Sequence, residues 1–390
     1  MQLRGGSPEE AGMLPARIEL TRQRLKQWSE EGVTPALVVL AARRGVIVLH
    51  EALGRLGPSE DSPPVQLDSL FPLASISKVI TATAIMILVD DGLLGLSRRV
   101  QEYVPRFVGE GKEHVMVHHL LTHTSGLRDK EVGAHAESKK DKVKIPPPEA
   151  NQHAEIHEYL YLESDAPLSE LPGREMSYSN TGYLLLGEII RRVSGKGFGD
   201  FVTERIFEPL GMHNSFFSVP QHARDRVVRR SADLPFAAFL DDPSYLERPA
   251  AWAGGYSTSM DMAAFCQMFL NHGSYGQARI LSPASVSEMT RNQIPNVAST
   301  FKEDHEREAS RGYGWDVKGA KKPRYHGSLD SPTAFTHQGA GGTSILVDPT
   351  FNLVTIYFSV ARGVMTSARY SPQWSMDLFT NMVTAAVVDG

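Results

Sequence analysis

Cysteine is nearly absent from this sequence: Cys266 is the only one in 390 residues. A single thiol excludes an intrachain disulfide framework and a zinc site built from several cysteines. A large excess of one charge is also missing, because 40 Lys and Arg residues stand against 45 Asp and Glu residues, giving a net charge of −5. This mildly acidic balance does not favour general binding to nucleic acids or to anionic membranes.

Long hydrophobic runs are absent as well. The first residues, MQLRGGSPEEAG, contain no apolar core of the kind that a secretory signal requires. The strongest apolar run, Val79 to Val89, includes two threonines and ends at Asp90, so it is too short to cross a bilayer. We therefore expect a soluble cytoplasmic protein with no membrane partner, in which this run is a buried helix.

The sequence has an ordinary globular composition, with 41% hydrophobic and 22% charged residues. Its length is enough for two lobes or one large α/β unit. Short apolar runs bounded by turn residues predict strands near both ends, at 35–42, 46–50, 335–337, 343–348 and 353–360. Helices are expected at 7–31 and 374–388. These patterns predict an α/β fold with one sheet built from both termini.

The middle of the chain has mostly helical patterns. Residues 75–91, 183–193 and 199–208 are expected to form helices, while the polar stretch 128–173 is expected to be a surface insertion. We predict two domains: an α/β domain of residues 1–74 and 236–390, and a mainly helical domain of residues 75–235. The active site is expected in a cleft between them.

A serine and a lysine three residues apart begin the apolar helix. Ser75 and Lys78 share one helix face, and the free N–H groups of a helix start lie close to the Ser75 hydroxyl. A lysine in such apolar surroundings can act as a base, because burial disfavours its charged form. The alternative is a capping serine followed by an unrelated lysine.

Two further polar motifs are candidates for a catalytic site. Tyr178-Ser179-Asn180 precedes a helix, and its tyrosine could move a proton while Asn180 orients a substrate carbonyl or Lys78. The segment His337 to Thr343 joins two predicted strands, and its small residues would let a ligand approach the backbone. Taken singly, the first is more commonly a helix-start loop with capping residues and the second a glycine-rich hairpin turn.

Together and in this order, the three motifs resemble those of serine β-lactamases and penicillin-binding proteins. Four further segments resemble the class C β-lactamase-like branch, which includes family VIII carboxylesterases: HLLTHTSGL (119–127), YSNTGY (178–183), PLGM (209–212) and GGYSTS (254–259). The resemblance covers about residues 8–388. It implies a β-lactamase-like fold, with an antiparallel sheet flanked by helices and a helical lobe, and an acyl-enzyme mechanism without a metal or cofactor.

The resemblance also implies roles for individual residues. Ser75 resembles the nucleophile, Lys78 its general base, and Tyr178 the group that protonates the leaving group. The backbone N–H groups of Ser75 and Ala340 would form the oxyanion hole. Asn180, His337, Gln338 and Gly339 would bind the substrate.

His337 departs from the pattern of enzymes that act on β-lactams, which usually carry a lysine there. An ordinary histidine is largely neutral at pH 7, so it provides no permanent charge for a substrate carboxylate. Neutral esters need no such charge. We therefore expect a serine carboxylesterase with a small-molecule ester substrate. The alternatives are a β-lactamase or D-amino-acid peptidase (DD-carboxypeptidase) of the same fold, and a non-catalytic penicillin-binding-like module.

Other features of the sequence give weaker indications of function. His153 and His157 lie four residues apart but have no evident third ligand for zinc. No G-x-S-x-G motif supports an α/β-hydrolase. Four aromatic residues could either line an acyl pocket or pack in the core: Trp252, Tyr256, Tyr313 and Trp315.

Overall fold

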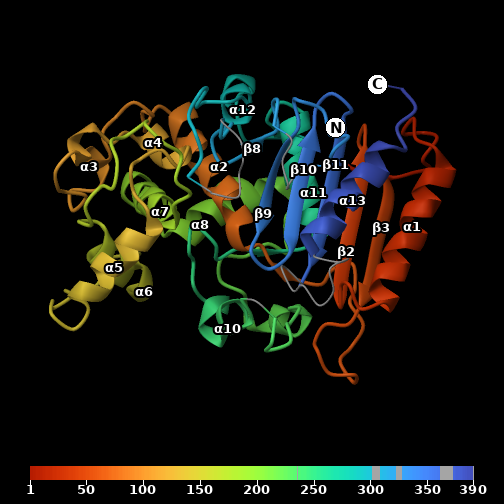
Figure 1. The fold of residues 1–390 in the computed structure, drawn as a ribbon, viewed down its shortest axis with the longest axis horizontal. Coiled ribbons are helices and arrows are strands. Elements are labelled where there is room, and N and C mark those ends of the chain that lie inside the picture. Colours follow the sequence, from red (N-terminus) through yellow and green to blue (C-terminus); the bar gives the residue numbers. More distant parts are fainter. Residues whose placement is uncertain (235, 301–307, 322–326, 361–371, 390) are drawn as a thin grey trace.

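The computed structural model describes residues 1–234, 236–300, 308–321, 327–360 and 372–389. Three gaps therefore fall inside the predicted α/β domain. Figure 1 shows a sheet on the right and a helical part, formed by the middle of the chain, on the left. Both termini lie at the upper right, beside the sheet.

In the main sheet the strands are short at the two edges and longest in the middle, and two further pairs of short strands form separate two-stranded sheets. They are β1 (Arg4–Gly5), β2 (Ala36–Arg43), β3 (Val46–Gly54), β4 (Phe71–Pro72), β5 (Tyr256–Ser257), β6 (Ser274–Tyr275), β7 (Ala278–Arg279), β8 (Asp316–Val317), β9 (Phe335–Gly339), β10 (Thr343–Asp348) and β11 (Leu353–Ser359).

The helices are α1 (Pro15–Glu30), α2 (Ser77–Asp90), α3 (Val100–Tyr103), α4 (Val117–Leu121), α5 (Asp129–Lys139), α6 (Ala154–Glu163), α7 (Asn180–Ser194), α8 (Phe198–Val202), α9 (Glu208–Leu210), α10 (Ala237–Leu240), α11 (Ser259–Leu270), α12 (Pro283–Thr290) and α13 (Pro372–Thr384). Short 3-10 helices are η1 (Ala74–Ile76), η2 (Lys112–His114), η4 (Gln221–Arg226) and η5 (Pro243–Leu246), and η3 (Thr203–Phe207) is a π-helical turn.

The main sheet combines strands from both ends of the chain, as predicted. Its order is β1-β3-β2-β11-β10-β9-β8. All neighbours pair antiparallel except β1 and β3, whose short pairing is parallel. The predicted antiparallel sheet is thus a mixed one, because the first residues of the chain form β1, which runs parallel to β3 at the sheet edge.

The side chains of β2 alternate between the two faces of the sheet. Leu37 and Val39 point toward α1 and α13, while Val38 and Leu40 belong to the larger core with α2 and α11. Successive side chains of a strand point to opposite faces, so an unbroken apolar run is suited to a strand covered on both sides. Figure 1 shows α1 and α13 on one side of the sheet, and α2 and α11 on the other.

Helix α2 lies at the centre of the molecule. Twelve consecutive residues of it, Ser77 to Leu88, are buried, in agreement with the prediction of a central helix. It packs against α7 and α8 of the helical part and contacts η1 at its N-terminal end. A helix that is apolar all round needs neighbours on every side, and α2 therefore joins the sheet to the helical part.

Several predicted boundaries were wrong. The first helix begins at Pro15 and not near Ser7, because residues 8–12 form turns before proline starts the helix. Residues 128–173 are not only a polar loop: they contain α5 and α6, whose sides face the rest of the helical part. The proposed division at 74/75 and 235/236 stays a prediction.

Two kinds of feature are absent from the described ranges. No helix there is long and apolar enough to span a membrane. No three His, Cys, Asp or Glu side chains there converge as a metal site would require.

Shortening a buried side chain of α2 should destabilise the protein strongly. Ile85 is fully buried in the core, so Ile85→Ala is expected to lower the free energy of unfolding by about 2–5 kcal/mol. Leu93, just beyond the helix, is 56% exposed, and Leu93→Ala is expected to change it by less than about 0.5 kcal/mol. Denaturant unfolding followed by circular dichroism measures both. Equal midpoints for the two variants would contradict the central position of α2.

Candidate active site

Ser75 lies in η1, immediately before α2, and not inside the α-helix that the sequence predicted. It is partly exposed, although its neighbours Ala74 and Ile76 are buried. Ala74 has a φ of 46°, a left-handed conformation that costs a non-glycine residue about 1–3 kcal/mol. The turn is held from both sides, because Leu73 N donates to Gly255 O at 2.7 Å and Gly255 N donates to Ser77 Oγ at 2.9 Å.

Lys78 is fully buried, and its amine meets three oxygens. Its Nζ lies 3.3 Å from Ser75 Oγ, 2.7 Å from Asn180 Oδ1 and 2.8 Å from the backbone oxygen of Trp252. A buried lysine without partners would be costly. The three contacts satisfy this one and aim its nitrogen at the serine hydroxyl.

Tyr178 completes the predicted group. Lys78 Nζ lies 4.7 Å from the centre of its ring. On another side, the buried ring of His123 stacks on Tyr178 with a centroid distance of 4.3 Å. Burial lowers the pKa of His123 well below its usual value, so His123 is a neutral support for the tyrosine, and its Nδ1 accepts a hydrogen bond from Ser179 N at 3.0 Å.

Asn180 is the first residue of α7, where the sequence placed it in a loop. Its backbone N–H donates to Asp129 Oδ2 at 2.8 Å, and the Ser179 hydroxyl donates to Asp129 Oδ1 at 2.9 Å. Ser179 is also the N-cap, accepting from Gly182 N at 3.1 Å. A carboxylate at a helix start is favourable, and here it fixes the residue that binds Lys78.

Strand β9 brings the third motif to Ser75. Strand β8 pairs only with Phe335 and Thr336, so β9 from His337 onward has no strand on its outer side within the described residues. A side chain at Gly339 would lie 2.3 Å from Leu73 O. Glycine is therefore required for β9 to approach η1, and it places Ala340, directly after the strand, near the segment that carries Ser75.

His337 is 5% exposed and lies in the same cluster, with its ring centre 6.4 Å from that of Tyr178. Its Nδ1 is 3.0 Å from Gln338 O, while its Nε2 is buried and has no hydrogen-bond partner among the residues that the structure describes. Burial, together with the charges of Lys78 and Arg311, lowers its pKa to about 3. The imidazole is therefore neutral at pH 7.

A cavity of about 290 Å³ opens beside this group, and we call it the Asn180 cavity. Its lining includes Asn180 and Trp252, the two residues whose oxygens contact Lys78. The insertion 128–173 also reaches it, because both α5 and α6 contribute to the walls. The lining residues are Asp129, Val132, Gly133, Tyr159, Glu163, Asn180, Thr181, Leu184, Phe239, Arg248 and Trp252.

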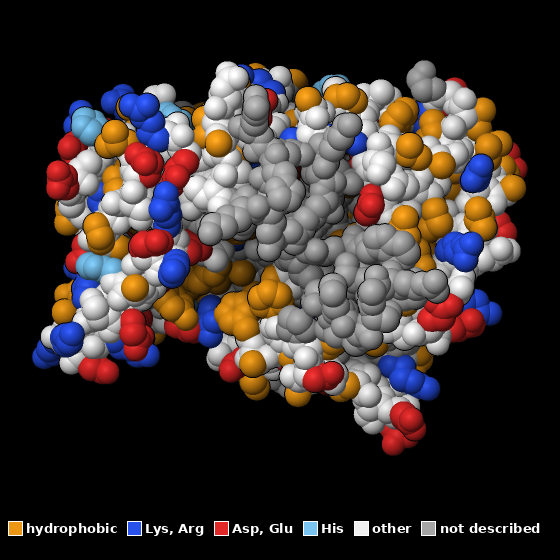
Figure 2. All heavy atoms as spheres, in the orientation of Figure 1, with side chains coloured by type: hydrophobic (Ala, Val, Ile, Leu, Met, Phe, Trp, Pro, Cys, Tyr) orange, Lys and Arg blue, Asp and Glu red, His pale blue; other side chains and the backbone are white. Residues whose placement is uncertain are grey.

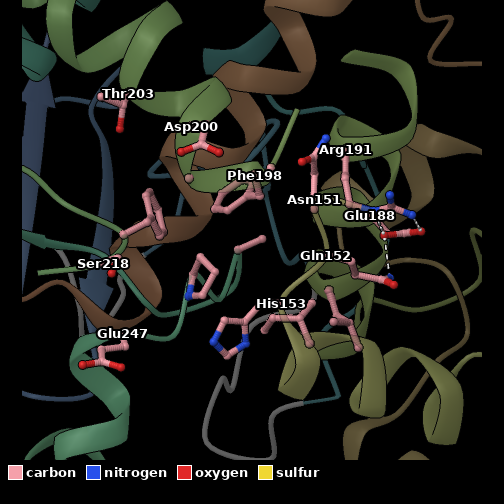
Figure 3. Close-up of a pocket in the computed structure, with 18 of the residues that line it drawn as sticks. Asn151, Gln152, His153, Glu188, Arg191, Phe198, Asp200, Thr203, Ser218 and Glu247 are labelled. Atoms are coloured by element: carbon pink, nitrogen blue, oxygen red, sulfur yellow. Dashed lines mark hydrogen bonds and ion pairs between the residues drawn. The ribbon is translucent and has the colours of Figure 1, made fainter. Parts of the chain in front are cut away.

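A larger cavity of about 490 Å³ lies between α7, α8 and the chain near residue 217 (Figure 3). Three of its polar side chains are occupied with one another: Gln152 donates to Glu188 Oε2 at 3.2 Å, and Arg191 forms an ion pair with Glu188 at 2.8 Å. None of the three motifs lines it. We therefore place the candidate site at Ser75.

The structure brings Ser75, Lys78, Tyr178 and Asn180 together, with His337, Gln338 and Gly339 on the adjoining strand, while their chemical roles stay predictions. Sequence reasoning missed two groups that hold them, the Asp129 carboxylate and the backbone oxygen of Trp252. Neither has a local signal, because a backbone carbonyl is common to every residue and Asp129 is about 50 residues from its partners.

The aromatic residues left open by the sequence divide between the two expected roles. The Trp252 side chain lines both cavities. Trp315 is fully buried against Phe269 and Phe335, and Tyr256 is buried as well. Tyr313 lines a separate small cavity near His118 and His119. Only Trp252 therefore stands beside the candidate site.

A methyl group on Gly339 should disrupt the site without unfolding the protein. Gly339→Ala would push β9 away from η1, and we expect kcat/KM for a hydrolysable substrate to fall about 100-fold, the size of effect seen when an oxyanion donor is misplaced. Gly5→Ala is the control, because a Cβ there meets nothing within 4 Å. Steady-state kinetics with circular dichroism tests this. Full activity of folded Gly339→Ala would rule out the close approach as a requirement.

Comparison with known proteins gives the family. The Beta-lactamase family model matches residues 21–373. The chain is 38% identical over 177 residues to "Penicillin-binding protein 4*" of Bacillus subtilis, a match covering 45% of this chain and 37% of that protein. It is 26% identical over 393 residues to the "Putative D-alanyl-D-alanine carboxypeptidase" of Escherichia coli, covering 90% and 84% respectively.

A solved structure of a family VIII carboxylesterase has the same fold. It superposes with a TM-score of 0.75 at 22% identity, covering 96% of this chain and 99% of that one. The family model covers most of the chain, and the segments that carry Ser75, Lys78 and Tyr178 meet at one place in the structure. The chain therefore belongs to the Beta-lactamase family and is a serine hydrolase of the β-lactamase and penicillin-binding-protein fold.

Proposed function

We propose that this protein hydrolyses small carboxylic esters through an acyl-enzyme on Ser75. The observation that carries the proposal is the neutral, buried His337 near the partly exposed Ser75 and the buried Lys78 that contacts it. The pair supplies an activated hydroxyl. The histidine offers no positive charge at pH 7, so this wall of the site suits a substrate without a carboxylate at that position.

The contacts of Lys78 fit the role of a base. A neutral amine has two N–H groups and one lone pair. Lys78 Nζ donates to Asn180 Oδ1 at 2.7 Å, to Trp252 O at 2.8 Å and to Ser75 Oγ at 3.3 Å, so loss of the proton that faces the serine leaves a lone pair directed at the Ser75 hydroxyl. Lys78 then takes the hydroxyl proton as Ser75 Oγ attacks the ester carbonyl carbon.

The remaining steps use groups on either side of the serine. The N–H groups of Ser75 and Ala340 stabilise the oxyanion of the tetrahedral intermediate. When the ester C–O bond breaks, the proton held by Lys78 passes to the departing alkoxide by way of the Tyr178 hydroxyl. Water then attacks the acyl-enzyme, gives up its proton by the reverse route, and releases the carboxylic acid and free Ser75.

Peptide substrates are the second candidate, favoured by the names of the curated relatives. A D-alanyl-D-alanine peptide ends in a carboxylate, which is bound well by a permanent cation. Position 337 carries a neutral histidine and not such a cation. Arg311 is a cation in the same cluster, 6.0 Å from the Tyr178 ring centre, but its charge is paired with Asp316. The neutral histidine therefore favours esters over such peptides.

Removing the Ser75 hydroxyl tests the nucleophile. Ser75→Ala is expected to reduce hydrolysis of nitrophenyl butyrate by at least about 10⁴-fold, because no other group can form the acyl-enzyme. Ser138→Ala, at an exposed serine of α5, is the control and should keep full activity. Mass spectrometry after a fluorophosphonate probe should show one adduct on wild type and none on Ser75→Ala. A wild type without an adduct would support a non-catalytic binding module instead.

Charge at position 337 should set the preference between esters and carboxylate-bearing substrates. In His337→Lys we expect the ratio of kcat/KM for nitrocefin to that for nitrophenyl butyrate to rise about tenfold, because a cation attracts the nitrocefin carboxylate. His337→Gln, which is neutral, should leave the ratio unchanged. Parallel assays of a D-alanyl-D-alanine peptide show which class the wild type prefers. A ratio unaffected by the lysine would show that His337 does not face the substrate.

A further inference from the structure

The walls of the Asn180 cavity combine aromatic rings with one unneutralised carboxylate. Tyr159 of α6 and Trp252 meet edge to face, with ring centres 5.7 Å apart and an interplanar angle of 88°. Phe239 of α10 lines the same cavity and is 42% exposed. Figure 2 shows hydrophobic side chains gathered along the hollow between the regions of α6 and α10. Aromatic faces carry partial negative charge and attract cations.

Two of the charged residues in this cavity are already balanced. Arg248 pairs with Glu155 through two contacts of 2.7 and 2.8 Å. Asp129 accepts the backbone N–H groups of Asn180 and Thr181 at the start of α7, where the partial positive charge of the helix offsets it.

Glu163 is different. Its Oε2 accepts one hydrogen bond, from the Thr181 hydroxyl at 2.8 Å, and no Lys or Arg among the described residues forms an ion pair with it. Burial, with the nearby charge of Asp129, raises the pKa of Glu163 to about 7. A bound cation would therefore supply the positive charge that the protein itself does not place there.

We propose that the Asn180 cavity is a subsite for an alkylammonium group of the ester substrate, surrounded by Tyr159, Trp252 and Phe239 and balanced by Glu163. This inference rests on the proposed ester hydrolysis and names the substrate class. Two cations stand near the cavity, and both already have partners: Arg248, which lines it and lies 6.0 Å from the Phe239 ring centre, is paired with Glu155, and Lys78 donates to Asn180 Oδ1 and Trp252 O. The volume of about 290 Å³ is at the lower end of the range of ligand pockets.

Two pairs of esters test the subsite from either side of the carbonyl. One pair is acetylcholine and 3,3-dimethylbutyl acetate; the other is the nitrophenyl esters of 4-(trimethylammonio)butanoate and 5,5-dimethylhexanoate. Each pair differs only by a quaternary nitrogen in place of a carbon. At pH 8.5, where Glu163 is ionised, we expect kcat/KM to favour the cationic member of one pair by about three- to tenfold, after allowance for aqueous reactivity.

Glu163→Gln should abolish that preference, measured as the ratio of kcat/KM for the two members of the pair. Glu158→Gln is the matched control, because it removes the same charge from an exposed position on the same helix and should keep the preference. Tyr159→Leu should weaken it. Equal rates within both pairs, or a preference that Glu163→Gln leaves intact, would overturn the proposal.

A binding measurement separates this inference from the proposed function. If no ester of either pair is hydrolysed, ester hydrolysis fails, and the subsite is then judged by calorimetry of tetramethylammonium chloride against neopentyl alcohol. Binding of the cation that is lost in Glu163→Gln and kept in Glu158→Gln supports the subsite. Absence of cation binding to the folded wild type rejects it.

Discussion

The hydrogen bonds of one buried amine are the constraint on which the site depends. Lys78 enters from a helix with almost no polar surface, and its partners come from α7 and from the segment before β5. Those partners can meet it only if the helical part packs on α2 as it does. Fold and chemistry are therefore coupled here: the packing that buries α2 also orients the nitrogen toward Ser75.

Much of this arrangement could be predicted from the sequence, because it depends on local patterns of residues or on motifs that resemble those of a known family. The hairpin of β2 and β3, the apolar α2 and the strands β9 to β11 were predicted from period and turn residues. The three motifs were predicted to meet, since a known family uses them in this order. The boundary of α1 was misplaced because Pro15 outweighs the weaker pattern before it.

What could not be predicted depends on contacts between distant segments. Helix α5 has a mostly polar sequence, and the packing of α5 and α6 on each other and on α7 is a tertiary contact that no local pattern shows. The Asp129 carboxylate and the Trp252 backbone oxygen are set by tertiary packing. The neutrality of His337 was expected from its ordinary pKa, but the large lowering of its pKa comes from burial and from the positive charges of nearby residues.

Trp252 serves the site in two separable ways, since its main chain supports the amine and its ring forms a cavity wall. The first function needs no particular residue type, because every amino acid carries the same peptide oxygen. The second depends wholly on the side chain. Evolution can therefore exchange the residue at 252 to admit bulkier or smaller substrate groups while the contact to Lys78 persists, which makes this position a route by which one scaffold diversifies.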